Sequence, residues 1–127
     1  MSGVDRLVAL ARSGVHRPGP AEARRAAEAG ALLVDIRPQE QRRREGAIPG
    51  ALVIERNVLE WRLDPEGSHH LPEARDHDVE VIVFCSEGYA SSLAAASLRE
   101  LGLHRATDLD GGFAAWAAQG LPTAPAG

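Results

Sequence analysis

The chain contains no lysine, a single cysteine and no long apolar segment. Without lysine, a Schiff base with a carbonyl substrate or with pyridoxal phosphate is excluded, because that chemistry needs an amine nucleophile. With Cys85 as the only thiol, an internal disulfide, a Cys-x-x-Cys redox pair and a cysteine-rich zinc site are excluded as well. We therefore expect no metal and no cofactor, and a protein that works in a reducing compartment.

Other absences disfavour membrane and nucleic-acid partners. No apolar run approaches the roughly 20 residues that span a bilayer. The first 14 residues include Asp5, Arg6 and Arg12 and are too short and too charged for a signal peptide. The net charge of −4 argues against the basic face that nucleic-acid binding needs. We expect a cytoplasmic protein, and the abundance of Arg, Ala, Gly and Pro indicates a GC-rich genome and a bacterial source.

The 127 residues, 44% of them hydrophobic, are enough for one domain with a buried core. Compact apolar runs alternate with segments whose apolar residues recur at helical spacing. The predicted strands are residues 31–36, 51–55, 80–85 and 106–110, and the predicted helices are residues 4–12, 20–29, 38–45, 57–63, 91–101 and 113–119. This alternation predicts an α/β domain with a mostly parallel central sheet of about five strands, flanked by helices on both faces.

Cys85 ends the most apolar of the predicted strands, at the sheet edge where ligands bind in α/β domains. Backbone N–H groups in a loop between a strand and a helix can form an anion cradle, and the helix dipole adds partial positive charge. Both effects favour the reactive thiolate, and Gly88 permits the sharp turn that the loop needs. The loop that we expect to surround the nucleophile consists of Ser86, Glu87, Gly88, Tyr89, Ala90 and Ser91.

Three alternative interpretations of Cys85 stay open on these residues alone. A lone cysteine at a strand end is often a small buried core residue. A cysteine-dependent phosphatase needs an arginine six positions after the cysteine, and that position is Ser91. A cysteine–histidine hydrolase needs an oriented histidine, and none of the five histidines lies in a recognisable motif.

Three segments, in this order and spacing, resemble the single-domain rhodaneses, a family of sulfurtransferases. They are LLVDIRPQEQRRREGAIPGA (32–51), VIVFCSEGYASS (81–92) and LDGGFAAWAAQGLP (109–122). They match the family's Asp-x-Arg strand end with its Gly-x-Ile-Pro-Gly-Ala turn, its Cys-x-x-Gly loop and its Gly-Gly-x-x-x-Trp helix. The resemblance implies a rhodanese-like domain at residues 15–123, preceded by a helical lead at 1–14 and followed by a flexible tail at 124–127.

The resemblance also implies a mechanism. The Cys85 thiolate would attack the outer sulfur of a donor such as thiosulfate or a persulfide and would become a persulfide itself. A thiol or cyanide acceptor would then remove that sulfur, in two half-reactions with ping-pong kinetics. The amides of residues 86–91 would hold the persulfide, and the acceptor must come from outside because the chain has no second cysteine. The six-residue loop, residues 85–90, is typical of family members with sulfur substrates, whereas phosphatases and arsenate reductases have one residue more.

The sequence departs from the family in the charge around the loop. Many relatives carry arginine at the sixth loop position, which here is Ala90, and Glu87 adds a negative charge. Both changes should weaken the binding of a dianion such as thiosulfate. Ala47 stands where the family usually has histidine, and we expect little effect on the chemistry. Our hypothesis is that thiosulfate is a poor donor and that a persulfide or another organic donor serves better.

Five residues outside the loop are candidates for substrate binding: Asp35, Arg37, Arg56, Trp61 and Arg62. For the first two, which form the Asp-x-Arg pattern, a structural salt bridge beside the site is the favoured alternative. The two later arginines could supply the positive charge that the loop lacks, or could be solvated surface residues. The tryptophan could line the pocket wall, although half-buried packing is its default.

Other side chains have simpler expected roles. We expect Trp116 in the core, Tyr89 at the pocket mouth, and Ser91 and Ser92 as helix caps. The arginines at 42–44 are expected to form a solvated helix face. His69, His70 and His77 lie in a polar loop, at a spacing that fits no closed metal site.

The leading hypothesis is a sulfurtransferase that carries sulfur on Cys85. The alternative is a non-catalytic or regulatory rhodanese-like module that binds a partner or senses sulfur, although such modules have usually lost the cysteine. The expected partners are a small-molecule sulfur donor and a thiol acceptor, which can be a protein. The oligomeric state does not follow from the sequence.

Overall fold

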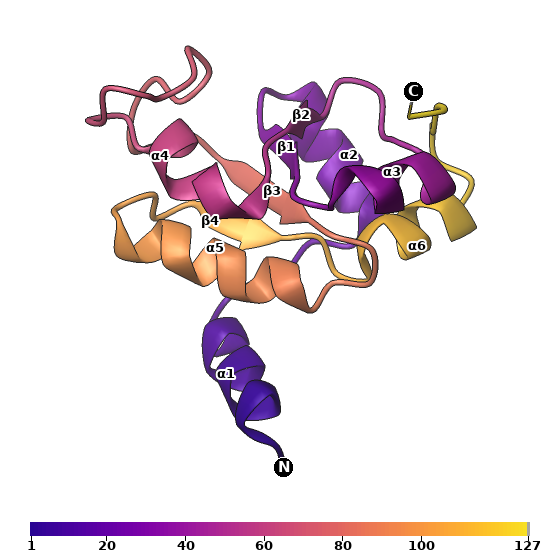
Figure 1. Ribbon diagram of the computed structural model, residues 1–127, viewed down its shortest axis with the longest axis horizontal. Helices are drawn as coiled ribbons and strands as arrows, with labels where there is room; N and C mark the ends of the chain where they lie inside the picture. Colours follow the sequence, from indigo (N-terminus) through magenta and orange to yellow (C-terminus); the bar gives the residue numbers. More distant parts are fainter. Residues whose placement is uncertain (127) are drawn as a thin grey trace.

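The computed structural model describes residues 1–126, and it has the predicted α/β architecture (Figure 1). Its strands are β1 (Leu32–Asp35), β2 (Leu52–Val53), β3 (Val81–Phe84) and β4 (Ala106–Asp108). Its helices are α1 (Gly3–Arg12), α2 (Pro20–Glu28), α3 (Gln39–Glu45), α4 (Leu59–Leu63), α5 (Ala90–Glu100) and α6 (Gly112–Ala118), with the short 3-10 helix η1 (Arg56–Val58) before α4. The sheet order is β2-β1-β3-β4 and every neighbouring pair is parallel. Within these residues the sheet therefore has four strands rather than about five.

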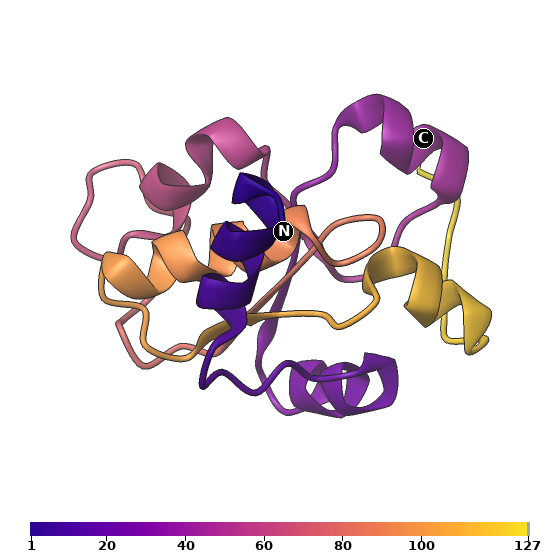
Figure 2. The same cartoon turned by 90° about the horizontal axis from the view of Figure 1, so that it is seen from below.

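Helices cover both faces of the sheet, as the sequence predicts (Figure 2). Because side chains alternate along a strand, Val81 and Val83 of β3 pack into one core with α4 and α5. Ile82 and Phe84 pack into a second core with α2 and α6, which contains Trp116 at 2% exposure. Burying each such side chain stabilises the fold by about 1.5–3 kcal/mol. The continuous apolar run of β3 thus reflects burial on both faces.

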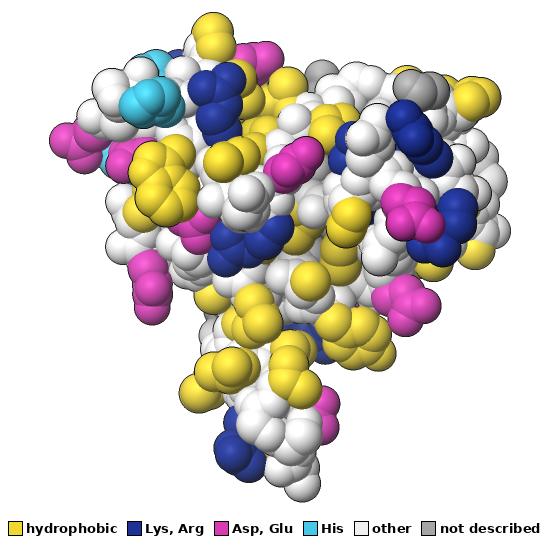
Figure 3. Space-filling model, viewed as in Figure 1, with side chains coloured by type: hydrophobic (Ala, Val, Ile, Leu, Met, Phe, Trp, Pro, Cys, Tyr) yellow, Lys and Arg dark blue, Asp and Glu magenta, His cyan; other side chains and the backbone are white. Residues whose placement is uncertain are grey.

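Helix α1 lies outside this layered body and packs against α5 (Figure 1). Its first turn is closed by a capping box between Ser2 and Asp5. Val4, Leu7 and Leu10 are all more than half exposed, and apolar surface is visible where α1 meets the body (Figure 3). Helix α1 extends the α4–α5 side of the molecule by a further layer.

Three boundaries differ from the sequence-based expectation. Strand β2 has two residues rather than five, because the chain leaves the sheet after the Ile54 N–H donates to the Asp35 carbonyl and turns into η1. Helix α5 begins at Ala90, so Ser91 and Ser92 lie inside its first turn and are not caps. Within the tail predicted at residues 124–127, the backbone N–H and C=O of Ala124 both pair with Ala47, and residue 127 lies outside the described residues.

Candidate active site

Cys85 follows β3 directly, at the carboxyl edge of the parallel sheet. The chain turns back towards its side chain at Gly88, where φ is +94°, a value that favours glycine. This turn brings the Gly88 N–H to 3.2 Å from the Cys85 Sγ. The hydroxyl of Ser91 lies 3.3 Å from the same sulfur. The partly buried thiol therefore has two polar neighbours that its own loop and helix supply.

The two serines at the start of α5 face inward and bind a buried carboxylate. The Oγ atoms of Ser91 and Ser92 donate to Oδ2 of Asp108, over 2.8 and 2.9 Å. Asp108 ends β4, the strand beside β3, and is only 2% exposed. The serines were expected to cap the helix, but tertiary contacts override that local preference. They connect the nucleophile to the neighbouring strand.

Two arginines from the N-terminal part of the chain bind the outer side of the cysteine loop. Arg12 of α1 donates to the Gly88 carbonyl over 2.7 Å and to the Ser92 hydroxyl over 2.9 Å. Arg17 donates to the same carbonyl over 3.0 Å and forms a bidentate pair with Asp108, at 2.9 and 3.1 Å. Its hydrogen bonds to Asp108 raise the pKa of Arg17 above its ordinary value. Arg12, from the helical lead predicted at residues 1–14, and Arg17, from the predicted domain, therefore both take part in holding the loop.

The start of α6 holds the loop from another side. The N–H groups of Phe113 and Ala114 donate to the carbonyls of Cys85 and Ser86, each over 2.9 Å. Gly112 has φ +61°, and a Cβ there would lie 2.6 Å from the Cys85 carbonyl oxygen and 2.8 Å from the Glu87 nitrogen. Glycine at 112, the first residue of α6, is thus required by the close approach of the two backbones. This contact explains the place of the third sequence motif in the site.

The Asp35–Arg37 pair is buried beneath the loop. Arg37 is 1% exposed and donates to both carboxylate oxygens of Asp35, over 3.0 and 2.6 Å. It also pairs with Glu45 at 3.1 Å, and Glu45 accepts a 2.7 Å hydrogen bond from Ser86. Burial alone would lower the pKa of Arg37, but hydrogen bonds and charge from these carboxylates raise it. The guanidinium also lies 4.4 Å from the centroid of the Phe113 ring. The salt bridge expected here is present, and it acts on the loop through Ser86.

The charged and aromatic side chains of the loop face outward. Glu87 and Ala90 are exposed, so the charge of Glu87 is screened by water. Tyr89 is 61% exposed, with the Arg12 guanidinium 5.4 Å from its ring centroid. Since Arg12 already binds the Gly88 carbonyl, it is committed to the outer side of the loop.

The other candidate substrate-binding residues lie on η1 and α4, beyond the end of β2. Arg56 pairs with Glu60 at 2.9 Å, and Arg62 donates to the His69 carbonyl. Trp61 is 61% exposed rather than half-buried. With Arg62, His69 and two neighbours, it lines an open hollow of about 390 Å³ to which residues 85–91 do not contribute. The contacts that these three side chains make are thus with η1, α4 and the loop after it, and their part in substrate binding stays a prediction.

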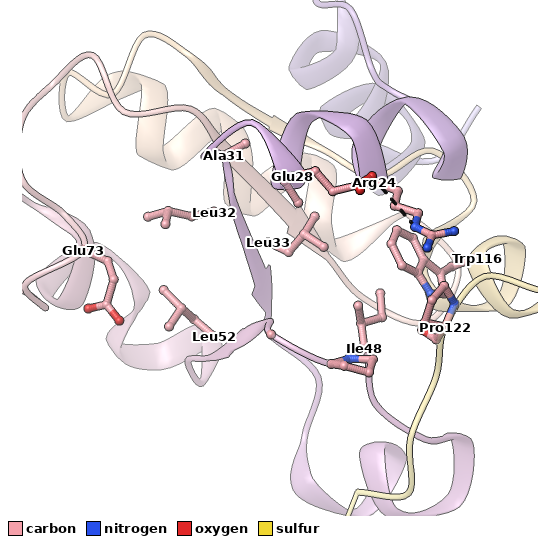
Figure 4. A pocket seen from close by; sticks show the side chains of 13 residues that line it. Arg24, Glu28, Ala31, Leu32, Leu33, Ile48, Leu52, Glu73, Trp116 and Pro122 are labelled. Atoms are coloured by element: carbon pink, nitrogen blue, oxygen red, sulfur yellow. Dashed lines mark hydrogen bonds and ion pairs between the residues drawn. The ribbon is translucent and has the colours of Figure 1, made fainter.

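A larger hollow, of about 440 Å³, lies away from the cysteine (Figure 4). Leu32, Leu33, Leu52 and Trp116 line it, with the Arg24–Glu28 pair of α2 near its rim. No residue of 85–91 contributes to it. Within residues 1–126, no three His, Cys, Asp or Glu side chains are grouped closely enough to hold a metal ion. No helix among these residues is long and apolar enough to span a membrane.

Comparison with known proteins identifies the family. The model of the rhodanese-like domain matches residues 19–119. The chain belongs to the rhodanese-like family. A sulfurtransferase of Allochromatium vinosum is 37% identical over 97 residues, which are 76% of this chain and 81% of that protein. The sulfurtransferase hypothesis is thus supported at the level of the family, while the comparisons name no donor or acceptor for this chain.

Two solved structures show how far the similarity extends. The human single-domain sulfurtransferase TSTD1 has a TM-score of 0.70 at 28% identity, covering 84% of this chain and 98% of its own. A Rhodopseudomonas palustris protein of unknown function, described as a possible tyrosine phosphatase, has a TM-score of 0.86 at 28% identity. That match covers 97% of this chain and 95% of the other. The similarity to this second structure therefore extends over nearly the whole fold.

Reasoning from the sequence missed the residues that support the loop from a distance. Arg12, Arg17 and Asp108 meet at the loop, although up to 96 positions separate them along the chain. Asp108 carried a weak signal, because it is a charged residue within the predicted strand 106–110. Arg12 and Arg17 carried no signal, since nothing in the sequence distinguishes them from the other 12 of the 14 arginines.

Proposed function

We propose that this protein is a sulfurtransferase that carries a sulfane sulfur as a persulfide on Cys85. The observation that carries the proposal is the position of Sγ, 3.2 Å from the Gly88 N–H within the strand-to-helix loop of a rhodanese-like domain. A backbone donor in this position stabilises negative charge on the sulfur. In the first half-reaction, the thiolate attacks the outer sulfur of the donor. A new sulfur–sulfur bond forms, the old one breaks, and its electron pair leaves with the rest of the donor.

We further propose that a monoanionic organic persulfide is a better donor than thiosulfate. Thiosulfate carries two negative charges, and its sulfite leaving group needs a cation. The loop has no arginine of its own, and Arg17, which lies behind it, is already shared between Asp108 and Asp110. The charge of Asp108 is thus balanced by Arg17, and Glu87 adds a solvent-screened negative charge in the loop itself. This charge balance favours the donor with the lower charge.

Phosphatase chemistry is less well supported by the same geometry. Its transition state needs a guanidinium six positions after the cysteine. Here that position is Ser91, which is fully buried and hydrogen-bonded to Asp108. At this position a phosphoryl group would find the Ser91 hydroxyl, with the Asp108 carboxylate behind it, where a phosphatase has a cation. We expect no hydrolysis of p-nitrophenyl phosphate above that of the Cys85→Ser variant.

The proposal is tested by loading the reduced protein with glutathione persulfide and, separately, with thiosulfate. Intact mass spectrometry then measures one added sulfur atom, with Cys85→Ser as the control. We expect sulfur on the wild type only, and faster loading from the persulfide. The variant Ala90→Arg should speed loading from thiosulfate more than from the persulfide, and Ala90→Gln is its uncharged control. Absence of sulfur on wild-type Cys85 from both donors would contradict the proposal, and equal loading rates would contradict the choice of donor.

A further inference from the structure

The hydroxyl of Ser91 lies between two groups that can carry negative charge. Its Oγ is 3.3 Å from Sγ of Cys85 and 2.8 Å from Oδ2 of Asp108. A serine hydroxyl has one proton, so it donates to only one of them at a time. Ser91 is fully buried, and water therefore does not compete readily for this proton. The direction of the O–H bond must depend on the charge of the sulfur.

The two acceptors, Asp108 and Sγ of Cys85, differ in how many other hydrogen-bond donors contact them. Asp108 is bound by both Nε and Nη2 of Arg17 and by the hydroxyl of Ser92. It remains well satisfied if Ser91 turns away. For Sγ, the other close donor is the N–H of Gly88 at 3.2 Å. A charged sulfur therefore gains more from the Ser91 proton than the carboxylate loses.

We propose that the Ser91 hydroxyl is a catalytic hydrogen-bond donor that turns from Asp108 to Sγ of Cys85 whenever negative charge develops on that sulfur. Asp108 is its positioning residue. When Cys85 is a thiol, its S–H donates to Ser91, whose O–H donates to Asp108. When Cys85 is a thiolate, the hydroxyl rotates about its C–O bond and donates to Sγ. The role of the Ser91 hydroxyl in turnover rests on the proposed sulfur transfer. Its effect on the charge of the Cys85 thiol does not depend on that proposal.

The second half-reaction shows why such a donor would be useful. An acceptor thiolate attacks the outer sulfur of the Cys85 persulfide. A bond forms between the acceptor sulfur and the outer sulfur, the bond from the outer sulfur to Sγ breaks, and its electron pair goes to Sγ. In the persulfide the charge is on the outer sulfur, so the hydrogen bond to Sγ strengthens only as this bond breaks. A donor of this kind lowers the barrier rather than binding the ground state.

The first test follows transfer from protein that has been loaded with glutathione persulfide and freed of excess donor. Loss of the added sulfur to dithiothreitol is followed by rapid quenching and intact mass spectrometry. We expect Ser91→Ala to slow this step by about 10- to 100-fold, as for loss of a hydrogen bond to a charged group. Ser91→Thr keeps the hydroxyl and should stay close to wild type. Ser97→Ala is the matched control, because Ser97 lies on the same helix and its hydroxyl donates to Glu60 rather than to Asp108.

The second test needs no sulfur donor and is therefore independent of the proposed function. The rate of iodoacetamide alkylation of Cys85 is measured against pH. We expect Ser91→Ala to move the midpoint of this profile upward by about one pH unit, the equivalent of a tenfold loss of thiolate. Asp108→Asn should move it downward, because the new amide can donate to Oγ and free the serine proton for the sulfur. When Ser91 is already alanine, Asp108→Asn should move the alkylation midpoint by a smaller amount. That remaining shift is the direct effect of removing the carboxylate charge.

Three results would overturn the inference. One is a Ser91→Ala variant that matches Ser97→Ala in both transfer rate and alkylation midpoint. Another is an Asp108→Asn shift of the same size with and without the serine. Where Ser91→Ala does not fold, failure of Asp108→Asn to lower the midpoint in the Ser91→Thr and wild-type proteins decides against it. Absence of sulfur on wild-type Cys85 would instead refute the proposed function, and the alkylation profile would still test the role of Ser91.

Discussion

Replacement of Gly112 by alanine should damage the site more than it damages the fold. Gly112 begins α6 at φ +61°, against the backbone of the cysteine loop. An added Cβ would lie 2.6 Å from the Cys85 carbonyl oxygen and 2.8 Å from both the Ser86 carbonyl carbon and the Glu87 nitrogen. All three are backbone atoms, so no flexible side chain can move aside. The loop and α6 must separate.

The size of the effect follows from these distances. The closest contact is about 0.8 Å shorter than the 3.4 Å at which ordinary van der Waals contact begins. A displacement of about 1 Å at a reacting centre costs on the order of 100-fold in rate. The positive φ adds about 1–2 kcal/mol of strain, and the overlap adds about 1–3 kcal/mol. We therefore expect Gly112→Ala to lose about 2–5 kcal/mol of unfolding free energy and to load sulfur about 100-fold more slowly.

The chain offers a matched control at the other end of the same helix. Gly120 has φ +72°, and a Cβ there would meet no atom within 4 Å. Gly120→Ala should suffer the backbone strain alone, about 1–2 kcal/mol, and should load sulfur at the wild-type rate. Urea unfolding and the rate of sulfur addition by mass spectrometry measure both effects. If Gly112→Ala loads as fast as Gly120→Ala, the close approach of α6 does not position the loop.

Three further predictions concern groups around the site. Arg37→Met should cost about 3–5 kcal/mol in urea unfolding, because it leaves Asp35 buried without its partner, and Asp35→Asn in the same chain should restore part of the loss. Arg12→Ala should cost about 1–2 kcal/mol and slow alkylation of the cysteine, whereas Arg6→Ala, which removes a contact to the first residue of the chain, should do neither. Burial alone would raise the pKa of Glu60, but hydrogen bonds, chiefly from a serine of α5, lower it below its ordinary value. The advantage in unfolding free energy of wild type over Glu60→Gln should therefore be constant above about pH 5 and should disappear as the pH falls through the folded-state pKa. A constant difference down to pH 3 would contradict this.

The fold could be predicted from local patterns because each pattern has one dominant physical cause. The run at 81–84 is apolar at every position, since its strand is buried on both faces, and its alternation with helical segments implies a parallel sheet. Cys85 could be placed at the sheet edge for the same reason. The length of β2 was overestimated because 51–55 is apolar beyond the point where the chain leaves the sheet. A hydrophobic pattern marks buried residues rather than strand pairing, and Ile54 is buried beyond the end of β2.

The support of the loop could not be predicted, because it depends on contacts between distant segments. Ser91 and Ser92 have the residue type and position of helix caps, yet α5 begins one residue earlier and both hydroxyls face Asp108. The packing of α1 against α5 decides which of the 14 arginines reaches the loop. The amphipathic pattern of a helix does not specify the element that it packs against. Trp61 was expected to be half-buried, but the short α4 leaves its ring exposed.

The arginine missing from the loop has a structural counterpart behind it. Arg12 and Arg17 both donate to the Gly88 carbonyl, which belongs to the same peptide group as the Tyr89 N–H. Two charged donors on that oxygen polarise the peptide group and strengthen its N–H as a donor. Positive charge is therefore held on a backbone oxygen behind the loop, rather than on a guanidinium inside the loop that could grip a substrate. We expect this arrangement to help a dianionic donor less than an arginine within the loop would. Since Arg17 also neutralises Asp108, removing it would expose the sulfur to a buried carboxylate. The two arginine contacts thus support the proposal that Cys85 takes sulfur from a donor of lower charge.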